Sequence, residues 1–472
     1  MNFFLGIDLG TSYFKAGIFD TQGKLVGLGR SAVKKQTGNG AICELPIVEF
    51  WDTLKDSVNQ AILKAGINPS EILSISYSSQ ANSFVLLDEN NTPLTPLILW
   101  PDERAGKIPI SLEKLIERDD FQQKTGLGIL PGIQSIPTKL IWFQEHQPKT
   151  WRKVKSIMSI SDYLTYFLTG HKLSDFSTAS MTGLFDVCEE KWWDEALKVT
   201  GIGNDLLSNP KRTGSFVDVL TEKGANQLGL SKNTKFFLGG LDHHMVATGA
   251  DLLNSGNISE STGTVLACVN YKNGYEPQNG INIAPGLTKG YYFQMAFNEN
   301  GATALEWYQK NFAPRLSLDE LLEMAENVSP GCDGLEAIPS TDKYGDLSGF
   351  RNIKKEHTHG HFIRAILEST SQSLRDLINN KLEAKNLSGN VVSSGGGARS
   401  HLWIQIKADM LNRRFILPKC SELACQGAAL VGATGMMQNQ INKMSSKNEE
   451  SLIRIFTPNS VNVEKYKKLK CK

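Results

Sequence analysis

The most constraining feature of the chain is the turn that follows its first apolar run. Residues 3–7 are apolar apart from one glycine, and the run then meets Asp8 and a turn of Gly10, Thr11 and Ser12. A glycine lets the backbone approach a ligand closely, and the N–H and O–H donors beside it suit a phosphate. A carboxylate at the same place can hold a hydrated Mg²⁺. The pattern predicts a strand followed by a phosphate-binding turn, although a plain turn is the commoner use of such residues.

A second turn, in the other half of the chain, echoes the first. Residues 258–269 predict two strands joined at Gly263 and Thr264. Such self-similarity suggests two related halves, the second of which begins near residue 248. The echo is short, so an accidental likeness stays open.

Length and composition indicate a globular protein of two domains. The chain has 472 residues, too many for one compact core. We expect domains at residues 1–247 and 248–440, and a polar tail over residues 441–472. The net charge of +1 gives no global field for nucleic acid or an acidic membrane. Seven scattered cysteines without a Cys-x-x-Cys pair, no signal-peptide pattern and no membrane-spanning apolar run predict a cytoplasmic protein.

Alternation and turn residues predict the order of the elements. Residues 15–20 and 24–30 form a hairpin with a turn at Gln22 and Gly23. Residues 27–32 match the loose dinucleotide-binding pattern, but they lie inside this hairpin and not at a strand-to-helix turn, so we discount the match. Further strands are predicted at residues 72–78, 84–88, 234–238 and 390–394, and helices at residues 243–249, 361–385, 401–411 and 425–437.

A third glycine-rich turn follows the predicted strand at residues 390–394 and contains Gly396, Gly397 and Ala398. Glycines have no side chains that would crowd a nucleotide, so a nucleotide can lie against such a turn. Each turn taken alone is more often structural. All three in order, with Asp8 before the first, favour nucleotide binding over three ordinary turns.

Asp242 is the leading candidate for a catalytic base. It follows Gly239 and Gly240 at the end of a predicted strand, where α/β proteins present catalytic groups. An aspartate there can accept the proton of a hydroxyl that attacks a γ-phosphate. It can also cap the helix at residues 243–249, and the two roles are compatible. His243 adjoins it and faces either a substrate or the core.

The ordered motifs resemble the FGGY family of carbohydrate kinases, in particular its xylulokinase-like members. The likeness rests on residues 6–12, 239–242, 261–264 and 395–400, with further matches at residues 97–104, 137–140 and 161–164. It covers nearly the whole chain, from residue 3 to about residue 437. The resemblance implies an α/β fold of two actin-like (ribonuclease H-like) ATPase domains with a central cleft. Sugar would bind mostly to the first domain, and Mg-ATP between the two.

The resemblance also implies roles for individual residues. Asp8 would bind Mg²⁺ through water, and Asp242 would be the general base. The ATP phosphates would contact Thr11, Ser12, Lys15, Gly263 and Thr264, and the adenosine would lie along Gly396, Gly397 and Ala398. The sugar would contact Gln80, Ala81, Asn82, Asp102 and Asp242, with His243 beside them.

We expect a kinase that uses Mg²⁺ and ATP to phosphorylate a ketose, with a pentulose as the leading candidate. The chain has Ala81 and Asn82 where xylulokinases carry Met-His, so D-xylulose itself stays open. Other candidate acceptors are glycerol, erythritol, L-ribulose and L-fuculose. A non-catalytic regulator that binds sugar and nucleotide is the alternative from another class, and the retention of Asp8 and Asp242 argues against it. The expected partners are a small sugar or polyol and ATP, and a homodimer stays open.

Overall fold

The chain folds into two compact units, and each is described by itself. The computed structural model describes residues 2–38, 41–252, 257–339, 347–382, 389–436 and 452–469. Unit 1 comprises residues 1–249, 271–294 and 422–447, and unit 2 comprises residues 250–270, 295–421 and 448–472. In the described ranges, no helix is both long and apolar enough to cross a membrane.

Unit 1 is built on a seven-stranded mixed sheet in the order β14-β15-β6-β1-β2-β3, with β16 also paired to β6. The strands are β1 (Phe3–Leu9), β2 (Tyr13–Phe19), β3 (Leu25–Ala32), β6 (Ile72–Ser79), β14 (Phe216–Val219), β15 (Lys235–Phe237) and β16 (Gly240–Leu241). Strands β1, β2 and β3 are antiparallel, which confirms the predicted hairpin. Strand β6 runs parallel to β1, and β15 and β16 run parallel to β6, so the carboxyl ends of β1, β6 and β16 meet at one edge.

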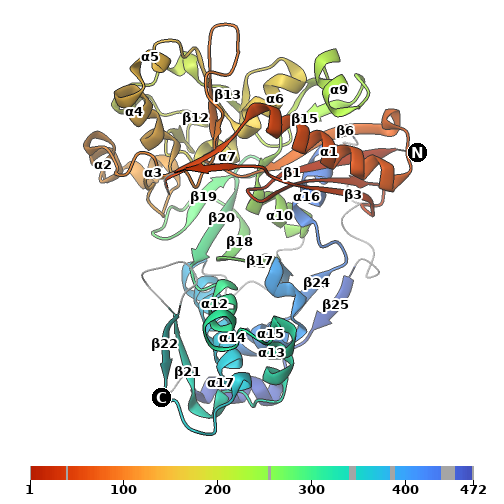
Figure 1. Ribbon diagram of the computed structural model, residues 1–472, viewed down its shortest axis with the longest axis vertical. Helices are drawn as coiled ribbons and strands as arrows, with labels where there is room; N and C mark the ends of the chain where they lie inside the picture. The colour runs from red at the N-terminus through yellow and green to blue at the C-terminus, as the bar shows by residue number, and fades with distance from the viewer. Residues whose placement is uncertain are drawn as a thin grey trace. The chain divides into compact units, whose positions relative to one another are not determined.

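Helices cover both faces of this sheet, namely α1 (Ile47–Ala65) on one face and α16 (Leu423–Met436) on the other (Figure 1). Glycines let the helix backbones come close. A Cβ atom added at Gly29 in β3 would lie 1.7 Å from the carbonyl oxygen of Ser57 in α1. One added at Gly6 in β1 would lie 1.9 Å from the carbonyl oxygen of Cys425 in α16. Residues 27–32 therefore form a strand whose glycines serve helix packing, which confirms that the dinucleotide pattern was rightly discounted.

The rest of unit 1 surrounds a second sheet in the order β4-β5-β8-β7-β9. Its strands are β4 (Gln36–Gly38), β5 (Ile42–Leu45), β7 (Phe84–Leu87), β8 (Leu97–Ile98) and β9 (Ser156–Ser159). The short strands are β10 (Leu173–Asp175), β11 (Phe185–Asp186), β12 (Lys191–Trp192), β13 (Asn209–Lys211) and β19 (Asn282–Pro285). The helices are α2 (Ile110–Ile116), α3 (Phe121–Thr125), α4 (Ile136–His146), α5 (Pro148–Trp151), α6 (Ile160–Thr169), α7 (Phe176–Ser180), α8 (Asp194–Thr200), α9 (Glu222–Leu228) and α10 (Asp242–Gly249).

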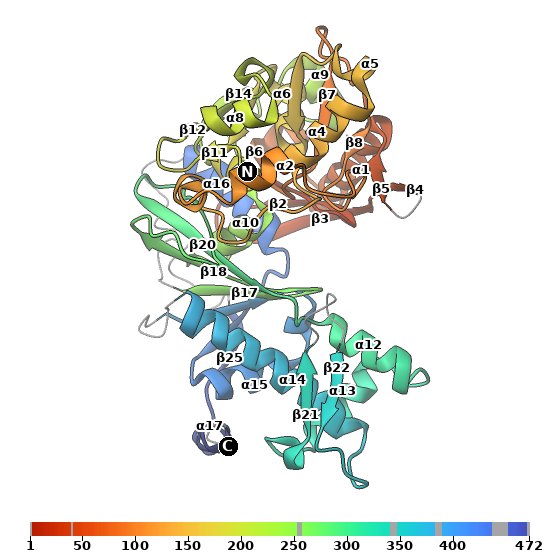
Figure 2. The ribbon, with the colours of Figure 1, turned by 90° about the vertical axis from the view of Figure 1, so that its left-hand side faces the viewer.

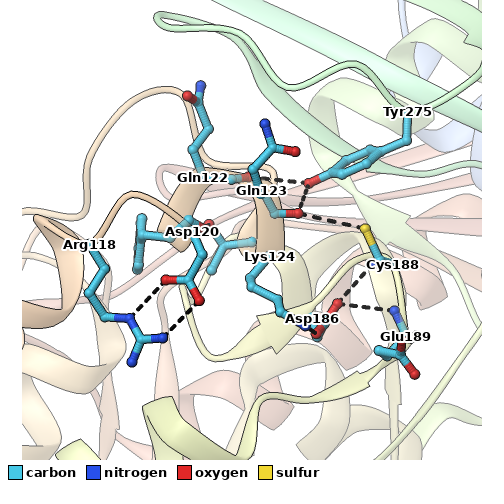
Figure 3. Close-up of polar contacts among 11 residues, drawn as sticks. Arg118, Asp120, Gln122, Gln123, Lys124, Asp186, Cys188, Glu189 and Tyr275 are labelled. Atoms are coloured by element: carbon cyan, nitrogen blue, oxygen red, sulfur yellow. Dashed lines mark hydrogen bonds and ion pairs between the residues drawn. The ribbon is translucent and has the colours of Figure 1, made fainter.

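Residues 271–294 belong to unit 1, although they follow the first residues of unit 2 along the chain. The Tyr275 hydroxyl donates to the carbonyl oxygens of Gln122 (3.2 Å) and Gln123 (3.0 Å) in α3 (Figure 3). The Ile283 amide donates to the carbonyl oxygen of Gly126 at 2.7 Å, just beyond α3. The units are thus interleaved along the chain, in contrast to the two contiguous domains expected from the sequence.

A second seven-stranded sheet has the order β19-β20-β18-β17-β23-β24-β25. Besides β19, its strands are β17 (Ile258–Thr262), β18 (Leu266–Asn273), β20 (Tyr291–Asn298), β23 (Val391–Ser394), β24 (Phe415–Pro418) and β25 (Leu452–Phe456), and a separate pair is β21 (Glu336–Pro339) and β22 (Leu347–Arg351). Strands β17, β23, β24 and β25 lie wholly in unit 2, whereas β18 and β20 each extend into the residues of unit 1. Figure 2 shows β17, β18 and β20 as neighbouring strands. The helices of unit 2 are α12 (Thr303–Phe312), α13 (Leu318–Glu326), α14 (His359–Asp376), α15 (His401–Leu411) and α17 (Ser460–Leu469).

The two main sheets repeat one arrangement. Strand β1 has β2 as an antiparallel neighbour on one side and β6 as a parallel neighbour on the other. Strand β17 has β18 and β23 in the same relation. Each series continues with a parallel strand, β15 or β24, and then an antiparallel edge strand, β14 or β25. The expected internal repeat is therefore visible in the strand pairing.

The structure corrects the expectation of a polar tail for residues 452–469. Strand β25 pairs with β24, and α17 buries Val463 and Tyr466. The Tyr466 hydroxyl donates to Glu368 Oε1 in α14 at 2.8 Å. The remaining residues of the expected tail, 441–451 and 470–472, lie outside the described residues. Val463 and Tyr466 are three residues apart and therefore lie on one helix face, a pattern from which the helix could have been predicted.

Candidate functional site

Three strand ends in unit 1 place candidate residues at one edge of its main sheet. The register pairs Leu9 of β1 with Ser79 of β6, and Leu241 of β16 with the same Ser79. Asp8 therefore lies near the end of β1, and Asp242 follows the end of β16. Carboxyl ends of neighbouring parallel strands are where α/β proteins bind ligands.

Asp8 is a buried carboxylate with few partners, and it is 8% exposed. Its Oδ1 accepts a hydrogen bond from the Ser78 hydroxyl at 3.0 Å, and its Oδ2 lies 3.8 Å from Lys15 Nζ. Burial raises the pKa of Asp8, and the negative charges of Asp242 and Glu422 raise it further. Lys15 and Ser78 offset only part of this, so the pKa of Asp8 is about 6.

Lys15 is closer to a carboxylate that the sequence did not point to. Its Nζ lies 2.7 Å from Glu422 Oε2, which is 407 residues away along the chain. Glu422 directly precedes α16, which lies against β1. Lys15 is therefore held mainly by Glu422, and it compensates the charge of Asp8 only in part. No local pattern marks Glu422, because its partner comes from the other end of the chain.

The turn after β1 is tied to the sugar-side candidates through side chains. The Trp100 indole N–H donates to Thr11 Oγ1 at 2.7 Å, and the Thr11 hydroxyl lies 3.4 Å from Gln80 Oε1. The side-chain Nε2 of Gln80 donates to the carbonyl oxygens of Leu9 and Gly10, each at 3.3 Å. The Thr11 hydroxyl and the Gln80 amide therefore brace the turn. Ser12 is exposed next to them.

Asp242 is the first residue of α10. Its Oδ1 accepts a hydrogen bond from the amide of the next residue, His243, at 2.7 Å. Its charge also raises the pKa of Asp8, which places the two carboxylates within electrostatic reach. Both predicted features of Asp242, the helix start and the strand-end position, are present.

His244 differs from its neighbour His243 in being fully enclosed, with 1% of its surface exposed. Its ring stacks on Phe293 with 4.4 Å between centroids. Within the described residues, neither of its ring nitrogens has a hydrogen-bond partner. Burial, and then the charge of His243, lower the pKa of His244 to about 3, so the ring is neutral at ordinary pH.

Two predicted sugar contacts have their polar side-chain atoms engaged within the protein. Asn82 accepts from the Ile136 amide at 3.2 Å and donates to the Met181 carbonyl oxygen at 3.3 Å. Asp102 is 0% exposed and accepts from the Arg104 side chain at 2.7 and 2.9 Å and from the Cys43 amide at 2.7 Å. Burial raises the pKa of Asp102, but these hydrogen bonds outweigh it and leave the pKa below its usual value.

Lys139 braces the same region, and sequence reasoning gave it no role in the site. It lies in α4, is 0% exposed, and donates to the carbonyl oxygens of Asn82 (3.0 Å) and Leu99 (3.1 Å). Asn82 has a positive φ of 58°, and Leu99 directly precedes Trp100. Burial is the main cause that lowers the pKa of Lys139 to about 7. Lys139 therefore fixes the loops at Asn82 and Leu99. Ala81 stands between Gln80 and Asn82 in the sequence, so both of its neighbours are held.

The second turn, between β17 and β18, rests on the start of α12 in unit 2. The Ala302 amide donates to the Gly263 carbonyl oxygen at 2.7 Å. A Cβ added at Gly301 would lie 2.3 Å from the Thr264 carbonyl oxygen, so only glycine fits below the turn. Thr264 itself is exposed. Gly301 was not singled out in the sequence, because its partner lies 37 residues earlier in the chain.

The third glycine-rich turn, with Gly395, Gly396 and Gly397, lies beside this second turn. Ser261 of β17 pairs with Ser394 of β23, directly before the triplet. A Cβ added at Gly397 would lie 2.8 Å from Thr262 Cβ, whereas one added at Gly396 would meet nothing within 4 Å. Gly397 and Ala398 are buried. Unit 2 therefore brings its two predicted nucleotide segments together and leaves Gly396 facing open space.

A buried ion pair lies behind the second turn. Glu260 and Lys407 are both 0% exposed, and Lys407 Nζ lies 2.9 Å from Glu260 Oε1. The Thr262 hydroxyl accepts from Lys407 at 2.7 Å and donates to Glu260 Oε2 at 2.8 Å. The Ser393 hydroxyl donates to the same carboxylate. This closed network joins β17, β23 and α15, and only the tertiary structure brings its members together.

Comparison with known proteins accounts for both units. The family model described as "FGGY family of carbohydrate kinases, N-terminal domain" matches residues 3–249, and the C-terminal-domain model matches residues 266–436. The xylulose kinase of Lactococcus lactis subsp. lactis (strain IL1403) is 29% identical over 99% of this chain and 95% of its own length. The gluconokinase of Bacillus subtilis (strain 168) is 27% identical, over 93% and 89%.

A solved structure agrees in fold. The crystal structure of a xyloylose kinase from Brucella ovis has a TM-score of 0.87 at 23% identity, and the match covers 99% of this chain and 97% of that chain. The expected α/β fold of two actin-like ATPase domains is thereby confirmed. The chain belongs to the FGGY family of carbohydrate kinases.

Proposed function

We propose that this protein transfers the γ-phosphate of Mg-ATP to a hydroxyl of a ketose, with a pentulose as the acceptor. The observation that carries the proposal is the pair of carboxylates, Asp8 and Asp242, at one sheet edge of unit 1. Asp242 raises the pKa of Asp8, and the nearest cation, Lys15, is held by Glu422. Two carboxylates beside a glycine-rich turn suit phosphoryl transfer, in which the protein mainly positions groups and balances charge.

The residues around Asp8 fit a divalent cation. Ser78 occupies one carboxylate oxygen of Asp8, and the other oxygen is 3.8 Å from the ammonium of Lys15. Burial, and then the negative charges of Asp242 and Glu422, raise the pKa of Asp8, and a bound Mg²⁺ would stabilise its charged form. Mg²⁺ keeps several waters, so Asp8 would hold it through water. When bound, the ion would neutralise charge on the phosphates of ATP.

We assign nucleotide contacts to the glycine-rich turns of each unit, taken separately. In unit 1 the Thr11 hydroxyl accepts from Trp100, so the N–H groups of the turn, Ser12 and Lys15 would provide the phosphate contacts. In unit 2 the turn of Gly263 and Thr264 would bind phosphate. The adenosine would lie along Gly396, Gly397 and Ala398, where Gly396 has open space before it.

Asp242 would be the general base that takes the proton from the attacking hydroxyl. Its hydrogen bond from the His243 amide occupies one oxygen and fixes the carboxylate at the start of α10. The other oxygen would face the acceptor. General bases of this kind contribute about 10² to 10⁴ in rate.

The proposal of a pentulose rests on the likeness to xylulose kinases. Gln80, Asn82 and Asp102 engage their polar atoms internally, so they would act mainly by shaping the pocket wall. Ala81 and His243 would complete that wall. Gluconate is a second candidate acceptor because a gluconokinase is similar over most of the chain. Only small molecules are needed as partners, and we place the protein in the cytoplasm, where ATP is abundant.

A coupled assay of ADP release tests the proposal across D-xylulose, L-ribulose, L-fuculose, glycerol, erythritol and gluconate with Mg-ATP. We expect D-xylulose or another pentulose to give the largest kcat/KM. Asp242→Asn should lower kcat by about 10²-fold or more and leave ATP affinity within about twofold. A flat response across all acceptors would contradict the kinase assignment. Near wild-type turnover by the variant would contradict only the assignment of the base.

A further inference from the structure

A fully buried chain of hydrogen bonds leads from Asp175 to the backbone beside Asp242. Asp175 ends β10 and is 0% exposed, and Ser177 in α7 is 1% exposed. The Ser177 hydroxyl donates to Asp175 Oδ1 at 2.8 Å. The Leu241 amide donates to Ser177 Oγ at 2.7 Å. Leu241 directly precedes Asp242, so the chain of hydrogen bonds ends one residue from the proposed base.

The chemistry of these groups fixes the direction of the chain. A backbone N–H can only donate, so Ser177 Oγ must accept from Leu241. The hydroxyl hydrogen of Ser177 is then left for Asp175. Asp175 is itself held by the Thr178 amide at 2.8 Å, the Thr178 hydroxyl at 2.6 Å and the Tyr77 hydroxyl at 3.0 Å. A fully satisfied buried network of this kind is rigid.

Strand β16 depends on this contact because it is only two residues long. On one side it pairs with Ser78 and Ser79 of β6. On the other side Ser177 takes the outward-facing amide of Leu241. Without the Ser177 hydroxyl, β16 would keep only its pairing with β6, and the segment before Asp242 would be held on one side only.

The glycine pair before Asp242 has its physical reason here. A Cβ added at Gly240 would lie 2.6 Å from Ser177 Oγ, and one added at Gly239 would lie 1.7 Å from the Tyr77 carbonyl oxygen. The two glycines let the segment settle against Ser177 and against β6. The Gly-Gly-Leu-Asp motif and the Asp175–Ser177 pair therefore form one structural device.

We propose that Asp175 and Ser177 are positioning residues that set the location of the Asp242 carboxylate for proton abstraction. Both are buried, and they act through the Leu241 amide. This inference rests on the proposed function of Asp242 as the base. Because a displacement of about 1 Å can cost about 100-fold in rate, loss of the Ser177 hydroxyl should lower kcat by about 10- to 100-fold.

The main test compares Ser177→Ala with a matched control, Ser180→Ala. Ser180 lies in the same helix, is also 1% exposed, and also donates one hydrogen bond, to the Ser177 carbonyl oxygen at 2.9 Å. Kinetics with Mg-ATP and D-xylulose should show kcat reduced by 10-fold or more in Ser177→Ala, with both KM values within about threefold. Ser180→Ala should keep kcat within about threefold. Equal kcat in the two variants would overturn the inference.

A double variant separates positioning from general stability. In an Asp242→Asn background, Ser177→Ala should add less than about a twofold further loss, because residues that act as a unit are non-additive. A full additional loss would mean that Ser177 acts independently of Asp242, and the inference would be wrong. Asp175→Ala should reproduce the kcat loss of Ser177→Ala, since it removes the acceptor that orients the Ser177 hydroxyl.

Amide hydrogen exchange tests the geometry without any turnover. The Leu241 amide should exchange faster in Ser177→Ala than in the wild type, and at the wild-type rate in Ser180→Ala. Unchanged exchange in Ser177→Ala would overturn the inference even in an active enzyme. If the wild type turns over no acceptor, the proposed function fails, and the exchange result still decides whether Ser177 holds the segment before Asp242.

Discussion

Strands β1 and β17 are each followed by a Gly-Thr turn. Each has an antiparallel neighbour on one side and a parallel neighbour on the other. Their carboxylates are held differently. Glu260 of β17 is paired with Lys407 at 2.9 Å, and both are 0% exposed. Asp8 of β1 has its nearest ammonium, Lys15, at 3.8 Å, and its pKa is raised to about 6.

The difference separates a fully compensated carboxylate from a partly compensated one. Glu260 is compensated on all sides, so it joins strands and helix and has no capacity left for a ligand. The charge of Asp8 is compensated only in part, by Lys15 at 3.8 Å and by the Ser78 hydroxyl. Strained or poorly compensated groups of this kind are characteristic of functional sites. The carboxylate on β17 is thus used within the protein, whereas the carboxylate on β1 keeps capacity for a ligand, as the role proposed for Asp8 requires.

The largest expected effect concerns the compensated pair. Glu260→Gln leaves Lys407 charged in a fully buried place and should lower the free energy of unfolding by about 3–5 kcal/mol. Glu260→Leu combined with Lys407→Met should recover most of this loss, because no buried charge remains. Urea unfolding of the two proteins checks the prediction. A double variant as unstable as the single one would show that the pair contributes more than mutual compensation.

Asp8→Asn should have the opposite profile. We expect kcat to fall by about 10²- to 10³-fold, as on removal of a single electrostatic contact to a reacting group. Stability should not fall. The stability contribution of Asp8, with its raised pKa, is fully present below pH 3.8 and is lost as the pH rises through about 6, so an uncharged side chain at pH 7 relieves that cost. Kinetics and thermal unfolding at pH 7 check both parts, and a parallel loss of activity and stability would break the comparison.

His244 extends the comparison to a second uncompensated group in unit 1. Its pKa of about 3 lies below the ordinary value of 6.5, so only the unfolded chain takes up a proton between these values. Stability is therefore lost as the pH falls below 6.5, by about 2 kcal/mol at pH 5 for this group. His244→Phe keeps the stack on Phe293 and should remove the loss of unfolding free energy that His244 causes at low pH. Urea unfolding of both proteins at pH 5 and pH 8 isolates the difference, and identical pH dependence would contradict the prediction.

The turn glycines give the smallest expected effect on stability. A Cβ added at Gly10 would lie 2.8 Å from the Tyr13 carbonyl oxygen, whereas at Gly263 the nearest atom would be 4.0 Å away. Gly10→Ala should therefore cost about 1–2 kcal/mol, and Gly263→Ala less than about 0.5 kcal/mol. If Gly263→Ala still weakens ATP binding by about 10-fold in calorimetry, the glycine is needed for the ligand and not for the fold. Unchanged ATP affinity would remove this turn from the proposed nucleotide site.

Much of the architecture could be predicted from local patterns. The helix predicted at residues 425–437 is observed as Leu423–Met436, and the one at residues 243–249 as Asp242–Gly249. The expected polar tail was wrong for residues 452–469, because two buried side chains on one face of α17 were outweighed by a charged composition. The interleaving of the units could not be predicted either, because it depends on contacts such as that of Tyr275 with α3.

The sequence by itself determined many of the strands, the glycine turns and the family, because these depend on short periodic patterns and on residues that lie close together in the chain. It suggested the repeat, which the strand pairing then showed. Only the tertiary structure decided which charges are compensated. Lys15 is held by Glu422 and Leu241 by Ser177, across 407 and 64 residues of chain. Charge compensation depends on distances of a few ångströms between such remote groups. A sequence pattern therefore identifies Asp8 and Asp242 as candidates, and packing sets their electrostatics and their position.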